Sequence, residues 1–489
     1  MKGGATRRQE SRAETCMYFY LAVLHNRCRE RTDIMRGTQV FYKAADIAAQ
    51  YDKKLITSDQ AAGLVKSGDR VHLGTFGVIA RDFEASLAKR KDELDEVILH
   101  TSLWSYDDTY ETNKVDPEGD VFKIWSTHMS QKDRRVKTAG HAWYIPILYS
   151  DNNQMWAQHG KVNIAVFTVG PMDSYGNFNL GVTVGETKGV VQAADVVIVE
   201  VNENMPRCNG LENYINIAEI DYITQSTNYP IAELPVREAG GADAKIAENI
   251  LPLIEDGSCL QLGVGAMPNH LGKLLAKSDL KNLSVHTEML VDAFVDLYEE
   301  GKISGIKNFL PGKMVYTFAL GTKRLYEFLD NNQMCLGAPV DFVNNPYNIA
   351  KNDKVISINA ALQIDIYGQV SSESIGFSHI SGQGGQMNFV EGAYHSKGGK
   401  SFICTASTKT KDGKTESLIL PYLPPGGIVS CPRYAPQYIV TEYGIAMLKG
   451  LSTWERAEAL INIAHPDYRD DLVRQAEKQG IWCKTSKLL

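Results

Sequence analysis

A glutamate two residues after a histidine is the first feature of this 489-residue chain that could carry out chemistry. His286 and Glu288 end a short apolar run, and in an extended segment their side chains point to the same side. A carboxylate at the carboxyl end of a buried strand lies where α/β proteins form ligand sites. Taken alone, a surface glutamate is the simpler interpretation. The His-x-Glu of zinc deaminases also needs a Pro-Cys-x-x-Cys, which the chain lacks, so no metal site is predicted.

A Gly-x-Gly turn follows the apolar run at residues 259–262 and precedes a helical pattern. It contains Gly263 and Gly265, and Pro268 falls in the first turn of the expected helix, where its missing N–H is harmless. Backbone N–H groups at such a turn can hold a phosphate or a developing oxyanion. A dinucleotide fingerprint would need glycine in place of Pro268, so a nicotinamide enzyme remains the alternative from a different class. A tight turn without a ligand is the structural alternative.

A third segment, residues 380–389, contains three glycines. So many glycines do not suit the interior of a helix or strand, but they permit close backbone approach to a ligand. A flexible loop is the alternative, although Phe389 and the strand-like run at 401–405 indicate an anchored segment. A Walker A motif is excluded because Tyr394 stands where its first glycine would be, and neither Gly-x-Ser-x-Gly nor His-Glu-x-x-His occurs in the chain.

Strand and helix patterns alternate from about residue 55 onward. This alternation is typical of α/β layers with largely parallel sheets. A proline and a glycine pair at 232–243 mark the expected boundary, which predicts two α/β domains at 41–237 and 238–489. Both contain a turn, strand and glycine loop in the same order, which suggests that they are related. The expected strands are 69–74, 96–101, 162–169, 196–201, 259–262, 283–286 and 355–359, and the expected helices include 55–66, 83–90 and 244–251.

The first 40 residues are expected to be a poorly ordered extension. Residues 1–36 carry eight basic and four acidic side chains, opposite in sign to the net charge of −7 of the whole chain. The apolar run at 16–24 resembles a signal segment only faintly, because no small-x-small cleavage pattern follows it. A true start at Met35 is a second interpretation, so the segment is set aside for the fold.

The composition is that of a soluble globular protein, with 44% hydrophobic and 22% charged residues. The negative charge argues against binding to nucleic acid or to an anionic membrane. No apolar run approaches the ~18–20 residues that span a bilayer. Eight scattered cysteines without a Cys-x-x-Cys pair indicate reduced thiols, and a cytoplasmic location is expected.

Several segments taken together resemble the acetyl-CoA hydrolase/transferase family, the CoA-transferases with a catalytic glutamate. The resemblance runs from about residue 53 to 480, and it is specific because the motifs occur in the family's order. Within the family the chain looks most similar to the butyryl-CoA:acetate and 4-hydroxybutyrate CoA-transferases. The matching segments are 169–176, 263–268, 286–289, 361–369, 381–389, 440–446, 455–457 and 464–466.

The resemblance implies a role for each candidate residue. Glu288 would be the nucleophile, in a cleft between the two α/β domains. Gln363 is assigned more loosely than the others, because family members differ at that place. The residues that would contact CoA or the acyl carbonyl are Gly263, Val264, Gly265, Ala266, Met267, Gln363, Gly385 and Gln386.

The implied activity is transfer of CoA between a short-chain acyl-CoA, either butyryl-CoA or 4-hydroxybutyryl-CoA, and acetate. It would proceed by a ping-pong mechanism through a glutamyl-CoA thioester. A short-chain acyl-CoA hydrolase, such as an acetyl-CoA hydrolase, is the second interpretation. A non-catalytic CoA-binding protein is a third class, which is disfavoured because the nucleophile is present. No tightly bound cofactor is expected, since coenzyme A is part of the substrate. A homodimer or higher homo-oligomer is the expected assembly.

Overall fold

The computed structural model describes residues 44–481 except 139, 235–237 and 264. The predicted extension at 1–40 and the candidate residue Val264 therefore lie outside the described residues. By its internal contacts the chain divides into a short unit that ends at Gln50 and a long unit that begins at Tyr51. Helix α2 (Ala44–Lys54) opens the described chain, and all elements of the candidate site belong to the long unit.

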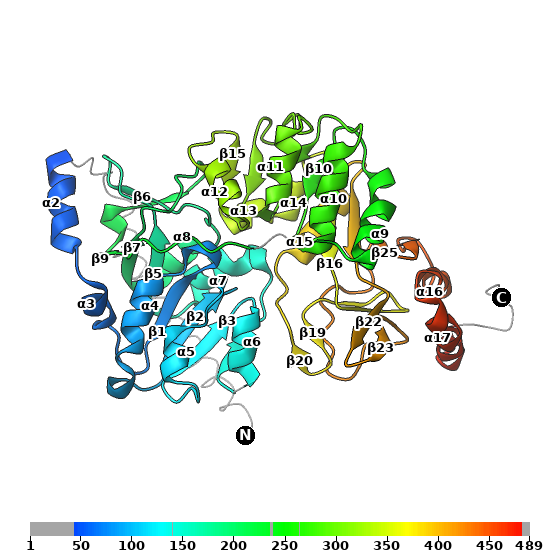
Figure 1. Ribbon diagram of the computed structural model, residues 1–489, viewed down its shortest axis with the longest axis horizontal. Coiled ribbons are helices and arrows are strands. Elements are labelled where there is room, and N and C mark those ends of the chain that lie inside the picture. Colours follow the sequence, from blue (N-terminus) through cyan, green and yellow to red (C-terminus); the bar gives the residue numbers. More distant parts are fainter. Residues whose placement is uncertain (1–43, 139, 235–237, 264, 482–489) are drawn as a thin grey trace, which may run out of the picture. The chain divides into compact units, whose positions relative to one another are not determined.

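A seven-stranded sheet is built from residues before 226 (Figure 1). Its order is β4-β3-β2-β1-β5-β7-β9, and every neighbouring pair is parallel. Parallel strands are buried on both faces, which explains the nearly continuous apolar sequences of β5 and β7. The strands are β1 (Arg70–Thr75), β2 (Val97–Ser102), β3 (Phe122–Ser126), β4 (Ala142–Tyr144), β5 (Val162–Val169), β7 (Ala194–Val201) and β9 (Tyr222–Gln225). The helices between them are α3 (Ser58–Ala62), α4 (Arg81–Ala88), α5 (Glu111–Val115), α6 (Gln131–Thr138), α7 (Asn152–His159) and α8 (Thr187–Ala193), with a 3₁₀ turn η3 (Tyr149–Asp151).

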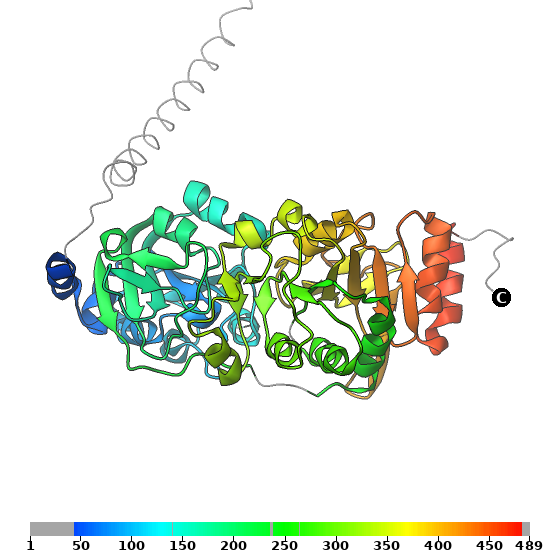
Figure 2. The same ribbon diagram turned by 90° about the horizontal axis from the view of Figure 1, so that it is seen from above.

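A six-stranded sheet is built from residues after 258, in the order β11-β10-β16-β21-β25-β26. Only the hairpin β25–β26 is antiparallel, and the other neighbouring pairs are parallel. The strands are β10 (Cys259–Gln261), β11 (Ser284–Val285), β16 (Val355–Ala360), β21 (Lys400–Cys404), β25 (Tyr438–Thr441) and β26 (Gly444–Met447). The helices of this half are α9 (Gly241–Ile250), α10 (Ala266–Lys277), α11 (Asp292–Glu299), α12 (Lys323–Leu329), α13 (Val340–Val343), α14 (Pro346–Ala350), α15 (Gln386–His395), α16 (Thr453–Asn462) and α17 (Pro466–Lys478). The last two lie side by side beyond β26 (Figure 2).

Small sheets of two or three strands lie outside the two large sheets. Strand β12 (Met289–Leu290) runs parallel to β14 (Phe318–Ala319), and β13 (Met314–Tyr316) runs parallel to β15 (Cys335–Gly337). The other small sheets are β6 (Asn177–Asn179) with β8 (Tyr214–Asn216), β17 (Gln363–Asp365) with β18 (Val370–Ser371) and β24 (Ile419–Leu420), β19 (Ser374–Ile375) with β20 (Ser378–His379), and β22 (Thr408–Lys411) with β23 (Lys414–Ser417).

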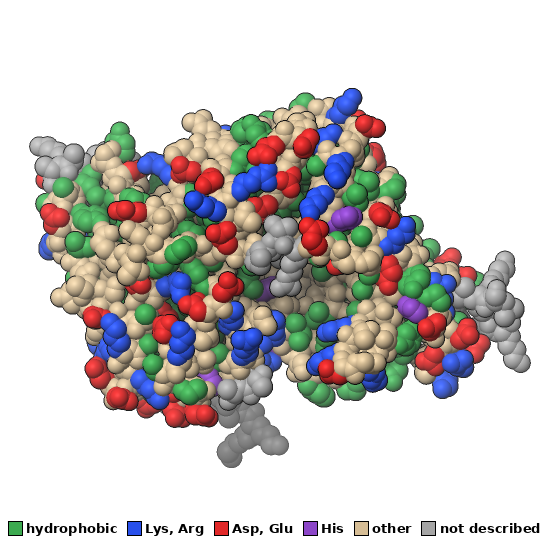
Figure 3. All heavy atoms as spheres, viewed as in Figure 1, with side chains coloured by type: hydrophobic (Ala, Val, Ile, Leu, Met, Phe, Trp, Pro, Cys, Tyr) green, Lys and Arg blue, Asp and Glu red, His purple; other side chains and the backbone are tan. Residues whose placement is uncertain are grey.

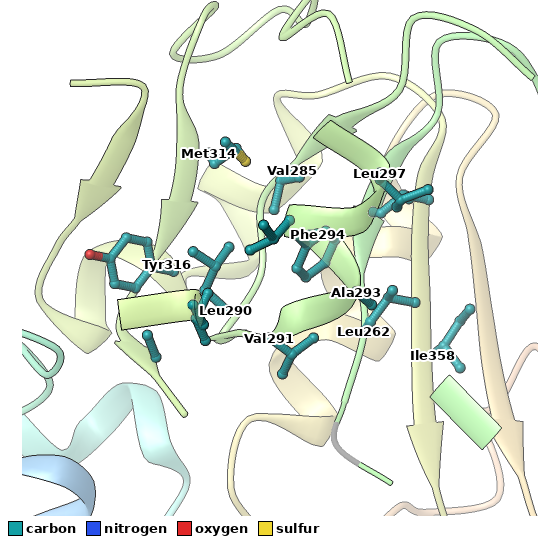
Figure 4. Close-up of a cluster of buried hydrophobic side chains, with 14 of the residues drawn as sticks. Leu262, Val285, Leu290, Val291, Ala293, Phe294, Leu297, Met314, Tyr316 and Ile358 are labelled. Atoms are coloured by element: carbon teal, nitrogen blue, oxygen red, sulfur yellow. The ribbon is translucent and has the colours of Figure 1, made fainter. Parts of the chain in front are cut away.

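A buried apolar cluster packs behind the segment that carries Glu288. Phe294 of α11 is completely buried against Val285 of β11 and Leu290 of β12 (Figure 4). Burying a side chain of this size contributes about 1.5–3 kcal/mol, so the strand before Glu288 and the helix after it are fixed against one core.

The predicted α/β class with largely parallel sheets is confirmed. Most predicted strands agree within two residues, and β5 has the predicted bounds. The predicted helix at 55–66 is shorter, because Leu55 forms a bridge with Ile223 and Gly63 ends α3. Thr57 caps this helix, as its residue type indicated, through a capping box with Gln60.

Candidate active site

Glu288 lies in the turn between β11 and β12, and its side chain is half-buried. Its carbonyl oxygen accepts hydrogen bonds from the N–H groups of Thr317 (2.9 Å) and Phe318 (3.3 Å). The preceding Thr287 donates its own N–H to Val315 at 2.9 Å. The backbone of the glutamate is therefore fixed by the neighbouring chain at 315–318, and the carboxylate position depends on a rigid element rather than on a free loop.

Two donors hold the Glu288 carboxylate. The amide Nδ2 of Asn344, at the end of α13, donates to Oε2 at 2.5 Å, and the N–H of Gly385 also donates to the carboxylate. Burial raises the pKa of Glu288 to about 7, while these two hydrogen bonds oppose the rise because they favour the charged form. The arrangement suits a nucleophile that is ionised near neutral pH.

Glycine is required at position 385 because the carboxylate occupies the space of a side chain. A Cβ built on Gly385 would lie 1.9 Å from Oε2 of Glu288 and 2.2 Å from Nδ2 of Asn344. The neighbouring Gly384 has a φ of +54°, which L-amino acids rarely adopt. The backbone of the glycine-rich segment therefore closely approaches the Glu288 side chain, whereas the predicted approach to a ligand stays a prediction.

The glycine-rich segment is anchored from the first half of the chain. Ser381 accepts the N–H of Met129 at 3.1 Å, and Gly384 accepts the N–H of Tyr149 at 3.0 Å. The N–H of Gln383 donates to the Tyr144 hydroxyl at 3.0 Å. In the view of Figure 3 the surface is hollowed near the place of α15 in Figure 1. Residues from both α/β halves thus converge on the start of α15, which faces Glu288.

His286 supports the site without taking part as an acid. It is completely buried, and its Nε2 donates to the carbonyl oxygen of Val343 at 2.8 Å, next to Asn344. Burial, followed by the charge of Lys307, lowers the pKa of His286 to about 3, so the ring is neutral at physiological pH. The predicted common direction of His286 and Glu288 is consistent with this geometry, since both side chains contact residues 343–344.

The Gly263 turn lies at the same sheet edge as Glu288. Strands β10 and β11 are parallel neighbours, with Leu260 opposite Val285, so the turn and the glutamate follow the carboxyl ends of adjacent strands. Gly265 is the N-cap of α10 with a φ of +130°. Among the described residues, and apart from the chain neighbours of Gly263, no atom lies within 4 Å of a Cβ built on Gly263. Ala266 is partly exposed, and Met267 is buried in the core. The part of the turn that is described therefore offers open backbone at Gly263.

The two candidate glutamines are placed differently. Gln386 donates through Nε2 to Ala360 at 3.0 Å, and its Oε1 accepts from the Ser372 hydroxyl at 2.9 Å. Gln386 therefore fixes the start of α15 to β16 and the loop after β18. Gln363, in β17, is buried, and its Oε1 has no hydrogen-bond partner within the described residues.

Asn344 is the residue that sequence reasoning missed. It stands in an Asn-Asn-Pro sequence in which Asn345 has the expected capping role, accepting from the N–H of Tyr347. Nothing in the local pattern distinguishes Asn344 from such a cap. Asn344 can donate to Glu288 only because the fold packs the end of α13 against the turn that carries Glu288.

Within the described residues, no group of three or more His, Cys, Asp or Glu side chains is arranged to hold a metal ion. In the same part of the chain, no helix has the length and apolar character needed to cross a bilayer.

Comparison with protein families gives matches over both halves of the chain. The model of the acetyl-CoA hydrolase/transferase N-terminal domain matches residues 40–235, and the model of the C-terminal domain matches residues 321–476. A butyryl-CoA:acetate CoA-transferase of Anaerostipes caccae is 46% identical over 90% of this chain and 99% of its own. A 4-hydroxybutyrate coenzyme A transferase of Clostridium kluyveri is 39% identical over 88% of this chain and 98% of its own.

Solved structures of similar proteins have the same fold over most of their length. RipA from Yersinia pestis superimposes with a TM-score of 0.81 at 35% identity, over 89% of this chain and all of that one. A 4-hydroxybutyrate CoA-transferase from Porphyromonas gingivalis superimposes with a TM-score of 0.72 at 30% identity, over 88% of this chain and 99% of that one. With matches over both halves, the chain belongs to the acetyl-CoA hydrolase/transferase family.

Proposed function

We propose that this protein is a CoA-transferase that moves CoA between a short-chain acyl-CoA, butyryl-CoA or 4-hydroxybutyryl-CoA, and acetate, with Glu288 as the nucleophile. The observation that carries the proposal is the half-buried Glu288 carboxylate, held by Asn344 and Gly385 at the edge of a parallel sheet. The names of the relatives from Anaerostipes caccae and Clostridium kluyveri support these substrates.

In the first half-reaction an oxygen of Glu288 attacks the thioester carbonyl of the acyl-CoA. The C–S bond breaks, CoA leaves as a thiolate, and a mixed anhydride joins the acyl group to Glu288. The thiolate then attacks the glutamyl carbonyl carbon. The bond to the acyl oxygen breaks, which releases the first carboxylate and leaves a glutamyl-CoA thioester.

In the second half-reaction acetate runs these steps in reverse. Its carboxylate attacks the glutamyl thioester, CoA thiolate leaves, and the thiolate then attacks the acetyl carbonyl of the new anhydride, which frees Glu288. Each addition at the glutamyl carbon puts negative charge on its oxygen. Asn344 Nδ2 and the Gly385 N–H are already directed at the Glu288 oxygens, and one such donor is typically worth ~2.7–4 kcal/mol in the transition state.

The CoA moiety is proposed to bind over the Gly263 turn. The open space above Gly263 and the adjacent N-terminus of α10 support backbone contact with the thioester or pantetheine portion. The predicted contacts also include Gly265 and the first two residues of α10, Ala266 and Met267, together with Val264, which lies outside the described residues. Gln363 contributes a buried oxygen without a partner in the described part of the chain.

Acetate dependence separates transfer from hydrolysis. With butyryl-CoA as donor, we expect acetyl-CoA to appear only when acetate is added, and release of free CoA thiol without acetate to remain a small fraction of that rate. Thiol release that dominates and ignores acetate would instead assign the protein as a hydrolase. The covalent intermediate gives a second test, because enzyme mixed with acyl-CoA alone should carry a hydroxylamine-sensitive CoA adduct on the peptide that contains Glu288.

A further inference from the structure

A histidine from the first half of the chain lies against the glycine-rich segment, beside the proposed nucleophile. His128 follows β3, at the carboxyl end of that strand, and its side chain is half-buried. Its carbonyl oxygen accepts hydrogen bonds from the N–H of Leu103 at 2.9 Å and from the Ser126 hydroxyl at 2.8 Å. The next residue, Met129, donates its N–H to the carbonyl oxygen of Ser381 at 3.1 Å. The backbone that carries the imidazole is therefore fixed both to its own sheet and to the glycine-rich segment.

The ring of His128 contacts two glycine positions of this segment. A Cβ built on Gly382 would lie 2.9 Å from Nδ1 of His128, which is closer than a real Cβ atom comes. A Cβ built on Gly384 would lie 3.8 Å from both Nδ1 and Cε1 of His128, and also 3.8 Å from Oε1 of Glu288. One point above Gly384 is thus in contact with the imidazole edge and with a glutamate oxygen, and these two groups cannot be more than twice that distance apart.

The two oxygens of the Glu288 carboxylate have different surroundings. Oε2 accepts the 2.5 Å hydrogen bond from Asn344, and it is also the oxygen nearest to a Cβ built on Gly385. Oε1 instead borders the space above Gly384, where a Cβ would make only ordinary contacts. Oε1 is therefore the oxygen placed to attack, and the imidazole edge of His128 lies across the space that the attacked group must enter.

The dimensions of this space fit a thioester carbonyl group. In a near-attack arrangement the carbonyl carbon lies about 3–3.5 Å from the nucleophilic atom. The C=O bond adds about 1.2 Å, and a hydrogen bond from a nitrogen to the carbonyl oxygen spans about 2.9 Å. Together these lengths reach about 7 Å when nearly aligned and less when bent, which is within the limit on the separation of His128 Nδ1 and Glu288 Oε1.

We infer that His128 is a second catalytic residue of the transfer reaction, and that its Nδ1–H donates to the acyl carbonyl oxygen while Oε1 of Glu288 attacks the carbonyl carbon. The inference rests on the proposed role of Glu288. As the Oε1–C bond forms, the π electron pair of the C=O bond moves onto its oxygen, and the donor stabilises this charge without giving up its proton. When the pair returns, the C–S bond breaks and CoA leaves as a thiolate, so the ring is unchanged at the end of the step.

The charge state of the ring suits a hydrogen-bond donor. Burial, followed by the charges of His379 and Arg134, lowers the pKa of His128 to about 4, so the imidazole is neutral at physiological pH. A neutral ring carries one N–H, and the inferred role requires the tautomer with this proton on Nδ1. Within the described residues the hydrogen bonds of His128 involve its backbone, so the ring is not committed to another described group. A neutral donor also leaves the Glu288 carboxylate without an ion pair that would weaken its attack.

The test is a single turnover of the full chain with butyryl-CoA, without acetate or free CoA, in which the CoA adduct on the Glu288 peptide is measured. His128→Asn keeps an N–H donor near the place of Nδ1, whereas His128→Leu has a similar shape and no donor. We expect the maximal rate of His128→Leu to fall by about 100-fold to 1,000-fold, and that of His128→Asn to stay within about tenfold of the wild type. The butyryl-CoA concentration that gives half the maximal rate should change little, because the hydrogen bond strengthens only as charge develops.

His379→Leu is the matched control. His379 is another half-buried histidine at the same segment, but its Nε2 bonds to the carbonyl oxygen of Ser381 at 2.7 Å and its ring stacks on Tyr144, with centroids 4.1 Å apart. Its loss should lower the melting temperature and leave the adduct rate of the folded protein within about threefold of the wild type. Equal losses of rate in His379→Leu and His128→Leu would mean that both rings only hold the segment in place, which would overturn the inference.

Gly384→Ala tests the same space without changing the histidine. The added methyl group would occupy the point that His128 and Glu288 both contact, so the carbonyl group could not lie between them, and the adduct rate should fall by about 100-fold. The φ of +54° at Gly384 strains any L-residue, and Gly376→Ala carries the same strain, because its φ is also +54°. The Cβ added at Gly376 lies 3.5 Å from the carbonyl oxygen of Pro425, so this variant should lose similar stability and keep its adduct rate.

A wild-type rate in His128→Leu, or the same loss in His128→Leu and His128→Asn, would overturn the inference. If His128→Leu does not fold, Gly384→Ala decides, because an unimpaired adduct rate there shows that the carbonyl group does not enter this space. Either result, together with adduct on the Glu288 peptide of the wild type, refutes only the role of His128. Wild-type enzyme that forms no adduct on that peptide refutes the proposed function itself.

Discussion

The side-chain amide of Asn344 donates a 2.5 Å hydrogen bond to Oε2 of Glu288, across 56 positions of sequence. This contact connects the end of α13 to the turn after β11. Together with the N–H of Gly385 it favours the charged form of a carboxyl group whose pKa burial raises to about 7. The balance of these two effects determines at which pH the proposed nucleophile is available.

Replacing Glu288 tests the nucleophile directly. Glu288→Gln keeps the size of the side chain and removes its charge, so transfer should be abolished while CoA still binds. Glu288→Asp withdraws the carboxylate by one methylene, and displacements of ~1 Å can cost ~100-fold in a covalent step. A water admitted to the gap would be activated by the aspartate, so the residual activity should shift toward hydrolysis. Full transfer by Glu288→Gln, measured as acetate-dependent acetyl-CoA formation, would refute the mechanism.

Asn344→Ala should shift the pH profile. Removing a donor that favours the carboxylate raises the pKa of Glu288 further, so the acid limb of kcat/KM should move to higher pH. A hydrogen bond to a charged group contributes about 1.5–3 kcal/mol, which corresponds to roughly one to two pH units. Rates from pH 5 to 9 measure this shift.

The control for Asn344→Ala is Asn352→Ala. Asn352 is another completely buried asparagine of the same half, and it accepts from the N–H of Phe309 at 2.9 Å. Its loss should lower the melting temperature without moving the acid limb. If the acid limb of kcat/KM lies at the same pH in both variants, Asn344 has no specific effect on the pKa of Glu288.

Gly385→Ala should displace the carboxylate. The added Cβ would occupy a place 1.9 Å from Oε2 of Glu288, so the side chain must move, and we expect a loss of about 100-fold in kcat. For Gly392→Ala in α15, the atoms nearest to the added Cβ belong to the Ile349 side chain, at 2.6 Å, so this change should lower stability and leave the specific activity of folded protein near that of the wild type. Single-turnover rates and melting curves for both variants separate the two effects, and unimpaired chemistry in Gly385→Ala would contradict the close approach.

Gly263→Ala tests the CoA turn. Apart from the chain neighbours of Gly263, no described atom lies within 4 Å of the added Cβ, and φ is outside the left-handed range there, so the protein itself should tolerate the change. If CoA approaches this backbone, KM for the acyl-CoA should rise about tenfold at an unchanged melting temperature. Gly265 is a poorer choice, because its φ of +130° strains any side chain whether or not a ligand binds.

The control for Gly263→Ala is Gly240→Ala, at the N-cap of α9, where an added Cβ also meets no atom within 4 Å. It should leave both KM and stability unchanged. If KM for the acyl-CoA in Gly263→Ala equals that of the wild type, CoA does not bind over this turn.

The alternation of apolar runs and helical patterns determined the α/β class, because strand and helix periods are local properties of the chain. Strand β5 could be placed within its bounds for that reason. Glu288 follows a strand end beside a glycine turn, but this pattern alone fits a surface glutamate equally well, and the predicted role of Glu288 came from the family resemblance. The anchoring of the glycine-rich segment was also predictable from the apolar Phe389 and the strand behind it.

Only the tertiary structure decided which groups surround the carboxylate. Asn344 has the sequence context of an ordinary helix cap, and Tyr149, whose N–H donates to Gly384, stands in a segment with no motif of its own. Parallel strands need long crossover connections, so residues at one sheet edge come from distant parts of the chain. Hydrogen bonds, burial and pKa shifts depend on those distant neighbours. For that reason local patterns predicted the elements, and the family resemblance pointed to Glu288, but neither indicated the donors that hold its carboxylate.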